Sequence, residues 1–167
     1  MSNQSINSMD YLYRGFNSNI SLEQAISPKN AHGAFETGAQ CGDSRVQCGD
    51  NDFMSGLSVA NTIHSHEYGG NGEPTGGLST TPDFNVARRY ALANGQYQSG
   101  KVIQLSVKIL LDHSTQIIKV NDCISNPACP ADDEHWVWYY GLSLPKDSII
   151  KIITVTKDQL HYDLNCD

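Results

Sequence analysis

The chain has 167 residues, of which 39% are hydrophobic and 17% charged, and its formal net charge is −7. This length and composition are typical of one globular domain with a buried core. The acidic balance disfavours a broad surface for nucleic acid or for anionic membranes, because both attract clustered Lys and Arg. No apolar run in the sequence approaches the length of a membrane span.

The first ten residues, MSNQSINSMD, are polar and carry no charged side chain before Asp10. They have neither the basic start nor the apolar stretch of a Sec signal peptide. We therefore expect residues 1–9 to form a flexible leader and residues 10–167 to form a single domain. Export of this chain would then use another route, or a signal that has already been removed.

The first part of the chain predicts one strand and two helices. Residues 11–16, YLYRGF, are short and aromatic, which is typical of a strand. Residues 21–27 predict a short helix with Ser21 as its N-cap. A loop rich in Gly, Asn and Asp is expected over 28–50, and apolar residues at helical spacing indicate a helix over 52–67.

The glycine-rich stretch 68–77 breaks the chain before a short strand over 78–81. A helix follows, with Thr81 as the expected N-cap and Pro82 as the first helical residue. Its apolar positions run through Ala91, so one face of this helix is expected to be buried.

The last third of the chain predicts strands. Alternating apolar residues and β-branched runs indicate strands over 101–110, 115–120, 134–140 and 148–156, with a loop over 121–133. Helices come early and strands late, without the alternation that builds a parallel sheet. The sequence therefore predicts an α+β fold with a mostly antiparallel sheet.

Five cysteines occur, and none of them forms a CxxC pair. The spacings within 41–48 and 123–129 suit small disulfide rings, but the odd number leaves at least one thiol unpaired, so both redox states remain open. A zinc site is disfavoured because such sites use tighter pairs. His64 and His66 are also poor joint ligands, because helix positions two apart point to different sides.

Common nucleotide and hydrolase motifs are absent from the sequence, including GxGxxG, the P-loop, HExxH and GxSxG. Three separated residues remain as candidates for chemistry: Arg14, Ser79 and Glu134. Taken singly, each has an ordinary structural interpretation, as a strand ion pair, a turn hydroxyl and a solvated carboxylate. Their order and spacing together carry the signal.

Three stretches, YLYRGF, GGLSTTPDFNVARRYA and PADDEHWVWYYGLSLPKDSIIKI, together resemble mono-ADP-ribosyltransferases of the Arg–Ser–Glu class, the cholera-toxin-like enzymes. The likeness covers most of residues 11–155. The first stretch resembles the aromatic–Arg strand, the second the STS-type strand and its helix, and the third the turn loop and catalytic Glu strand. The resemblance implies an α+β fold in which two mostly antiparallel sheets, flanked by short helices, form an NAD cleft.

The resemblance also implies roles for the candidate residues. Arg14 would hold the pyrophosphate of NAD, since a planar guanidinium matches phosphate oxygens, and Gly15 would let the backbone approach the ligand. Glu134 would stabilise the oxocarbenium-like ribose that forms as nicotinamide leaves. No general acid is required, because nicotinamide departs as a neutral molecule.

The hydroxyl-rich strand is expected to support this chemistry. The resemblance implies that Ser79 orients Glu134, and that Thr80 and Thr81 support the strand and complete the NAD site. One of the two histidines in the preceding helix is expected to line the cleft. NAD is a substrate in this scheme, and no metal is expected.

The resemblance implies transfer of ADP-ribose to a side chain of a target protein, by a bacterial toxin or effector secreted or delivered into a host cell. Arginine-modifying relatives carry Glu two residues before the catalytic Glu, whereas this chain has Asp132 there. Asp132 is expected to orient the acceptor, but its shorter reach leaves the type of acceptor open. A nucleic-acid target is disfavoured by the net charge, and the oligomeric state is open.

Two alternatives remain beside the transferase. One is an NAD glycohydrolase on the same fold, in which water is the acceptor. The other is a catalytically inactive module that binds a partner. Phe84 and Tyr90 are interpreted as core residues of the helix, with stacking on nicotinamide as the alternative. The aromatic run after Glu134 is interpreted mainly as sheet core, with target recognition as the alternative: Trp136, Trp138, Tyr139 and Tyr140.

Overall fold

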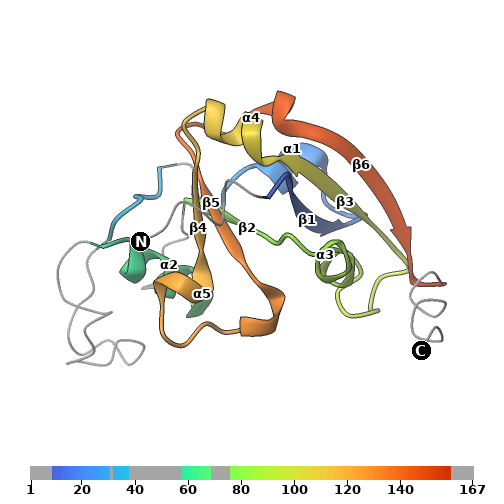
Figure 1. The fold of residues 1–167 in the computed structure, drawn as a ribbon. Coiled ribbons are helices and arrows are strands. Elements are labelled where there is room, and N and C mark those ends of the chain that lie inside the picture. Colours follow the sequence, from blue (N-terminus) through green and yellow to red (C-terminus); the bar gives the residue numbers. More distant parts are fainter. Residues whose placement is uncertain (1–8, 31, 38–57, 69–75, 159–167) are drawn as a thin grey trace.

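The structure is a computed structural model that describes residues 9–30, 32–37, 58–68 and 76–158 (Figure 1). Its helices and strands, with two short 3₁₀ helices labelled η, are β1 (Tyr11–Asn17), α1 (Leu22–Ile26), α2 (Val59–Tyr68), β2 (Gly77–Thr80), α3 (Phe84–Ala91), β3 (Ser99–Ser106), α4 (Val107–Asp112), β4 (Gln116–Lys119), α5 (Val120–Cys123), η3 (Pro130–Asp132), β5 (His135–Trp138), η4 (Lys146–Ser148) and β6 (Ile149–Thr156). The predicted α+β class is confirmed.

The strands form two small antiparallel sheets, which we call sheet I, in the order β1-β3-β6, and sheet II, in the order β2-β5-β4. The sheets are joined at one point, where Tyr13 and Thr81 exchange backbone hydrogen bonds of 2.7 and 3.0 Å. This junction brings the Arg14 strand beside the Ser79 strand. The strand that carries Arg14 and the hydroxyl-rich strand that carries Ser79 are far apart in sequence, and they therefore lie side by side in the fold.

The main core is built from apolar side chains of both sheets together with α1 and α4. Side chains alternate between the two faces of a strand, so Leu12, Arg14 and Phe16 of β1 share the face that enters this core. Arg14 is therefore carried between the sheets by the same alternation that buries its apolar neighbours. A second apolar cluster joins α2 and α5 to sheet II around Ile63 and Trp136.

Helix α3 covers the opposite face of sheet I (Figure 1). A Cβ atom on Gly15 would lie 1.9 Å from the Ala87 carbonyl oxygen, and one on Gly100 would lie 2.4 Å from the Ala91 carbonyl oxygen. Both glycines are thus required for the helix backbone to approach the strands. Packing of α3 on β1 is a reason for Gly15 that differs from the ligand approach expected from the sequence.

The start of α3 differs from the sequence prediction. Its N-cap is Asp83, whose side chain accepts the Asn85 amide, whereas Thr81 was expected in that position. Thr81 Oγ1 instead accepts the Asp83 amide at 3.1 Å and donates to the Asp132 carbonyl at 2.8 Å. Asp83 thus caps the helix in place of Thr81, because the Thr81 hydroxyl already links β2 to the segment that contains Asp132.

Two predicted strands end earlier than expected, because each runs into a short helix. The strand expected over 101–110 ends at Ser106, which caps α4 by accepting the Ile109 amide. Val107 and Leu110, three residues apart, are then buried together as on one face of a helix. Similarly, α5 begins at Val120, inside the strand expected over 115–120.

The strand predicted over 134–140 is confined to β5, and the loop predicted over 121–133 contains the end of α5 and the helix η3. The short helix predicted over 21–27 is confirmed. The helix α1 has the predicted Ser21 N-cap, completed by a reciprocal capping box with Gln24. Residues 52–57 of the predicted helix before the glycine-rich stretch lie outside the described residues, as do residues 1–8 of the leader expected over 1–9. Met9, the last residue of that leader, is described and packs against the main core. None of the helices described is long and apolar enough to cross a membrane.

The cysteines are described only in part. Cys129 is exposed and carries a free thiol, so the ring considered for 123–129 is not formed. Cys41, Cys48 and Cys166 lie outside the described residues.

Candidate active site

Arg14 is held by the backbone of two neighbouring elements. Its Nε donates to the Ala25 carbonyl at 2.7 Å, and its Nη1 donates to the Ser79 carbonyl at 2.8 Å. Burial lowers the pKa of Arg14, while the charges of Tyr139 and Glu134 act in the opposite direction. Two guanidinium nitrogens thus link β1 to α1 and β2, and Nη2 keeps no protein partner among the described residues.

Ser79 and Glu134 lie on the face of sheet II that α2 covers. Ser79 pairs with Trp136 across the strands, and Glu134 precedes Trp136 by two residues, so strand alternation brings both side chains to one face. His66 of α2 reaches them there. Its Nε2 is 2.8 Å from Ser79 Oγ and 3.4 Å from Glu134 Oε1.

A strained turn delivers Glu134 to this position. Asp133 has left-handed backbone angles of φ 45° and ψ 52° directly before it. Three contacts hold the turn: the Val120 amide donates to the Glu134 carbonyl at 2.9 Å, Lys119 Nζ lies 2.9 Å from Asp133 Oδ1, and His135 Nδ1 lies 2.9 Å from the Asp133 carbonyl. The backbone of Glu134, the candidate catalytic residue, is therefore anchored on sheet II.

Glu134 is ionised in this environment. Burial acts to raise the pKa of Glu134, but hydrogen-bonding contacts with His66, Glu67 and Ser79 outweigh it and hold the pKa at about 2. His66 Nε2 makes its shorter contact to Ser79 Oγ and lies 3.4 Å from the buried Oε1 of Glu134.

Glu67 is a residue that the sequence interpretation missed. Its Oε2 accepts the Ala128 amide at 2.8 Å. Burial and the neighbouring Glu134 raise the pKa of Glu67 to about 7, against the effect of the Ala128 amide. The only sequence signal is its place directly after His66, and a Glu at the end of a helix is ordinarily solvated.

One cavity of about 230 Å³ is bordered by all the residues to which the resemblance gave a role in the site: Arg14, Gly15, Ser79, Thr80, Thr81, Asp132 and Glu134. Its lining consists of Tyr13, Arg14, Gly15, Ser79, Thr80, Thr81, Val86, Ala87, Tyr90, Asp132 and Glu134. The cavity lies where β1, β2 and α3 meet the turn before β5. The structure thus brings together residues drawn from three separate stretches of the sequence.

The two threonines border the cavity, but their hydroxyls are already used by the protein. Thr80 Oγ1 donates to the His135 carbonyl at 2.7 Å, and Thr81 Oγ1 donates to the Asp132 carbonyl. They tie β2 to the segment that carries Glu134. Ser79 Oγ is instead 2.8 Å from His66 Nε2, which also lies 3.4 Å from Glu134 Oε1.

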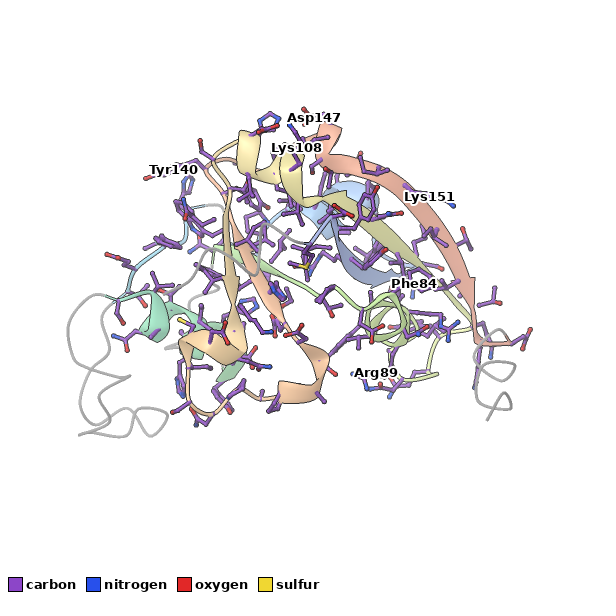
Figure 2. All side chains as sticks on the ribbon, in the orientation of Figure 1. Phe84, Arg89, Lys108, Tyr140, Asp147 and Lys151 are labelled. Carbon is purple, nitrogen blue, oxygen red and sulfur yellow. The ribbon has the colours of Figure 1, made fainter. Side chains whose placement is uncertain are left out.

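Asp132 is engaged in a clamp that the sequence interpretation did not anticipate. Its buried carboxylate forms an ion pair with Arg89 and accepts a 2.5 Å hydrogen bond from the Tyr90 hydroxyl. Both partners project from α3, where Figure 2 labels Arg89. Tyr90 is 52% exposed, so the expectation that it lies in the core is wrong; its ring stays at the surface because its hydroxyl is bound to Asp132.

We expect the clamp to stabilise the fold. Asp132→Asn removes the charge paired with Arg89 and should lower the free energy of unfolding by about 1–2 kcal/mol. Asp133→Asn is the matched control, because Asp133 pairs with Lys119 at a more exposed position and should change stability by less than about 0.5 kcal/mol. Urea denaturation of both variants would measure the difference. Equal effects at the two positions would contradict a structural role for the clamp.

The aromatic run after Glu134 divides between core and surface. Trp136 is fully buried, and Tyr139 is buried with its hydroxyl donating to the Ile26 carbonyl at 2.7 Å. The core interpretation is confirmed for these two residues. Tyr140 is 93% exposed and stands on the surface (Figure 2).

The two histidines of α2 point to different sides, as expected from their spacing. His64 is buried and its ring lies 4.8 Å from that of Tyr68, whereas His66 faces Ser79. Within the described ranges, no group of three or more His, Cys, Asp or Glu side chains is arranged to hold a metal ion.

The sequence was compared with models of known protein families and with curated proteins. Neither comparison found a match. The function of the site is therefore argued from its residues and geometry.

Proposed function

We propose that this protein is a mono-ADP-ribosyltransferase that transfers ADP-ribose from NAD to a protein side chain and releases nicotinamide. One observation carries the proposal. Arg14, Ser79 and Glu134 come from three distant stretches and border one cavity, and Glu134 presents an ionised carboxylate there. The motif resemblance places the same three residue types in an NAD site.

The chemistry requires a negative charge beside the ribose. The bond between ribose C1′ and the nicotinamide nitrogen breaks, and its electron pair leaves with nicotinamide, which changes from a cation to a neutral molecule. Positive charge then develops on the ribose, and a fixed carboxylate in a partly buried site stabilises it. Glu134 meets this need, since its low pKa keeps it charged and it borders the cavity.

The cavity fits part of NAD. Its volume of about 230 Å³ is below the roughly 300–1,000 Å³ of pockets that enclose drug-sized ligands. We infer that the nicotinamide ribose enters it and that the adenosine end extends outside. Arg14 would contribute Nη2 to a phosphate, while its other contacts keep the guanidinium rigid.

Ser79 and His66 position the carboxylate. The 2.8 Å contact between His66 Nε2 and Ser79 Oγ orders the hydroxyl beside Glu134, and the helix α2 thus supports the strand that carries Ser79. Ground-state contacts that hold a charged group in one orientation favour catalysis, because less reorganisation is needed in the transition state.

The final step adds a nucleophile to C1′, and the nucleophile loses its proton. We propose a protein side chain as this acceptor, in a chain that acts after secretion or delivery into a target cell; this part rests on the motif resemblance. An NAD glycohydrolase is the second candidate. It is favoured by the clamp on Asp132, whose carboxylate is bound to Arg89 and Tyr90 and is not free to orient an acceptor.

Labelled NAD distinguishes these activities. The protein is incubated with NAD labelled in the ADP-ribose part, with a eukaryotic lysate and separately with a bacterial lysate, and both labelled protein bands and free nicotinamide are measured. A labelled band supports the transferase. Nicotinamide release with free labelled ADP-ribose, and no labelled band in either lysate, supports the glycohydrolase. No consumption of NAD in any sample would overturn the proposal and favour an inactive binding module.

A further inference from the structure

Tyr90 stands at the mouth of the cavity. It borders the cavity and is about half exposed, so it lies between the cavity and the solvent. Asp132 borders the cavity from the turn before β5 and is buried. Within the clamp, the Tyr90 hydroxyl donates to Asp132 Oδ2 at 2.5 Å. This hydrogen bond therefore connects α3 to the turn across the mouth of the cavity.

Arg89 supports this hydrogen bond from outside the cavity. It pairs with Oδ1, the other carboxylate oxygen of Asp132, and its guanidinium carbon lies 5.5 Å from the centre of the Tyr90 ring. Arg89 itself does not border the cavity. Each side chain of the clamp thus contacts the other two, and the guanidinium over the aromatic ring adds a cation–π attraction. The clamp holds Tyr90 over the mouth by contacts with two different residues.

The clamp can open by the motion of one side chain. Tyr90 lies in the last turn of α3 and is already half exposed, so its ring can turn into solvent with little loss of buried area. Asp132 would stay in place, because Thr81 Oγ1 donates to its carbonyl at 2.8 Å and Arg89 keeps its pair with Oδ1. Opening therefore widens the mouth and frees Asp132 Oδ2 beside the cavity.

We propose that Tyr90 is a specificity-determining residue that selects the acceptor by size. With the clamp closed, water reaches ribose C1′ past Tyr90, and a longer acceptor enters only after Tyr90 swings away. A hydrogen bond to a charged group shifts an equilibrium by about 10- to 100-fold, so the closed clamp predominates in the free protein. This inference rests on the proposed function and assigns hydrolysis to the closed clamp and transfer to the open one.

Alcohols of different length test the selection. An alcohol oxygen forms a bond to C1′ as the bond to nicotinamide breaks, the electron pair leaves with nicotinamide, and the hydroxyl proton passes to water. The product is an ADP-ribosyl ether, whereas water as the acceptor yields ADP-ribose. The protein is incubated with NAD and either methanol or 1-butanol at equal concentration, and the ratio of ether to ADP-ribose is measured by chromatography. This ratio does not depend on how fast nicotinamide leaves.

Tyr90→Phe removes the hydroxyl and keeps the ring. Its ether ratio with 1-butanol should rise about tenfold over the parent protein, while the ratio with methanol should change by less than about threefold. Tyr97→Phe is the matched control, because Tyr97 is exposed and does not border the cavity, and it should keep both ratios. An unchanged 1-butanol ratio in Tyr90→Phe, or an equal rise for the two alcohols, would overturn the proposal.

Nuclear magnetic resonance tests the closed clamp without any NAD. Tyrosine rings are labelled with carbon-13 at Cζ, which gives two signals in mixed light and heavy water when the hydroxyl proton exchanges slowly. The Tyr90 signal is assigned by its absence from Tyr90→Phe. We expect slow exchange at Tyr90 and fast exchange at Tyr140, which is exposed. Fast exchange at Tyr90 would overturn the proposal even if NAD is consumed. Slow exchange at Tyr90 without consumption of NAD would mean that the proposed function fails and the closed clamp stands.

Discussion

Glu134→Gln should reduce nicotinamide release from NAD by about 10²- to 10³-fold, the range for loss of one group that stabilises transition-state charge. Gln keeps the size of Glu and its ability to accept a hydrogen bond, but it removes the negative charge on which the ribose cation depends. Because Gln and Glu have the same shape, we expect the fold to be retained. Steady-state release of nicotinamide, measured beside circular dichroism, provides the comparison.

Glu23→Gln is the matched control for this prediction. Glu23 is an exposed residue in the first turn of α1, and it does not border the cavity. The same chemical change there should leave the rate within about twofold, since surface substitutions away from special features have small effects. If Glu134→Gln kept more than a tenth of the parent rate while remaining folded, Glu134 would not be the group that stabilises the ribose.

Much of the fold could be predicted from local patterns. The first strand, the capped helix α1 and the strands of the last third follow from alternation and from capping residues that lie within a few positions of one another. The helix α4 could not be predicted, because the apolar residues of VKILLD fit the spacing of a strand as well as that of a helix. The Ser106 cap and the shared burial of Val107 and Leu110 decide for the helix, and that burial is a tertiary property.

The candidate site shows the same division. Arg14, Ser79 and Glu134 were proposed from motif order, and the structure places them around one cavity. The sequence contains no local signal for the contacts between distant segments that fix their geometry. The Asp132 clamp joins residues more than 40 positions apart, and Arg14 donates to the Ser79 carbonyl across 65 positions of the chain. Such pairs depend on how sheet II and the helices are arranged.

Arg14 illustrates how one residue can serve both the fold and the site. The resemblance implied a guanidinium free to grip a pyrophosphate. In the structure, Nε and Nη1 are bound to the carbonyls of Ala25 and Ser79, so the side chain first joins β1 to two other elements. A rigid cation at this junction loses little conformational entropy on binding a phosphate, which favours affinity. Structural and binding roles are therefore not alternatives at this position.

Arg14→Lys should accordingly lower both stability and affinity for NAD. An ammonium group keeps the positive charge but lacks the fork that reaches two carbonyls, and a partly buried carbonyl left without its donor costs about 2 kcal/mol of unfolding free energy. We expect KM for NAD to rise at least about tenfold, because the remaining donor no longer faces the cavity in a fixed direction. Urea denaturation and initial rates at several NAD concentrations measure the two effects.

Arg89→Lys separates this result from a general effect of replacing Arg by Lys. The Arg89 side chain is about half exposed, and a lysine there keeps a charge for the Asp132 carboxylate. Its unfolding free energy should change by less than about 1 kcal/mol. An Arg14→Lys protein with lowered stability but an unchanged KM would assign Arg14 to the fold alone and place the phosphate contact elsewhere. Unchanged stability with a raised KM would instead show that the two carbonyl contacts contribute little. Both losses together are expected from a guanidinium that joins three elements at the cavity wall.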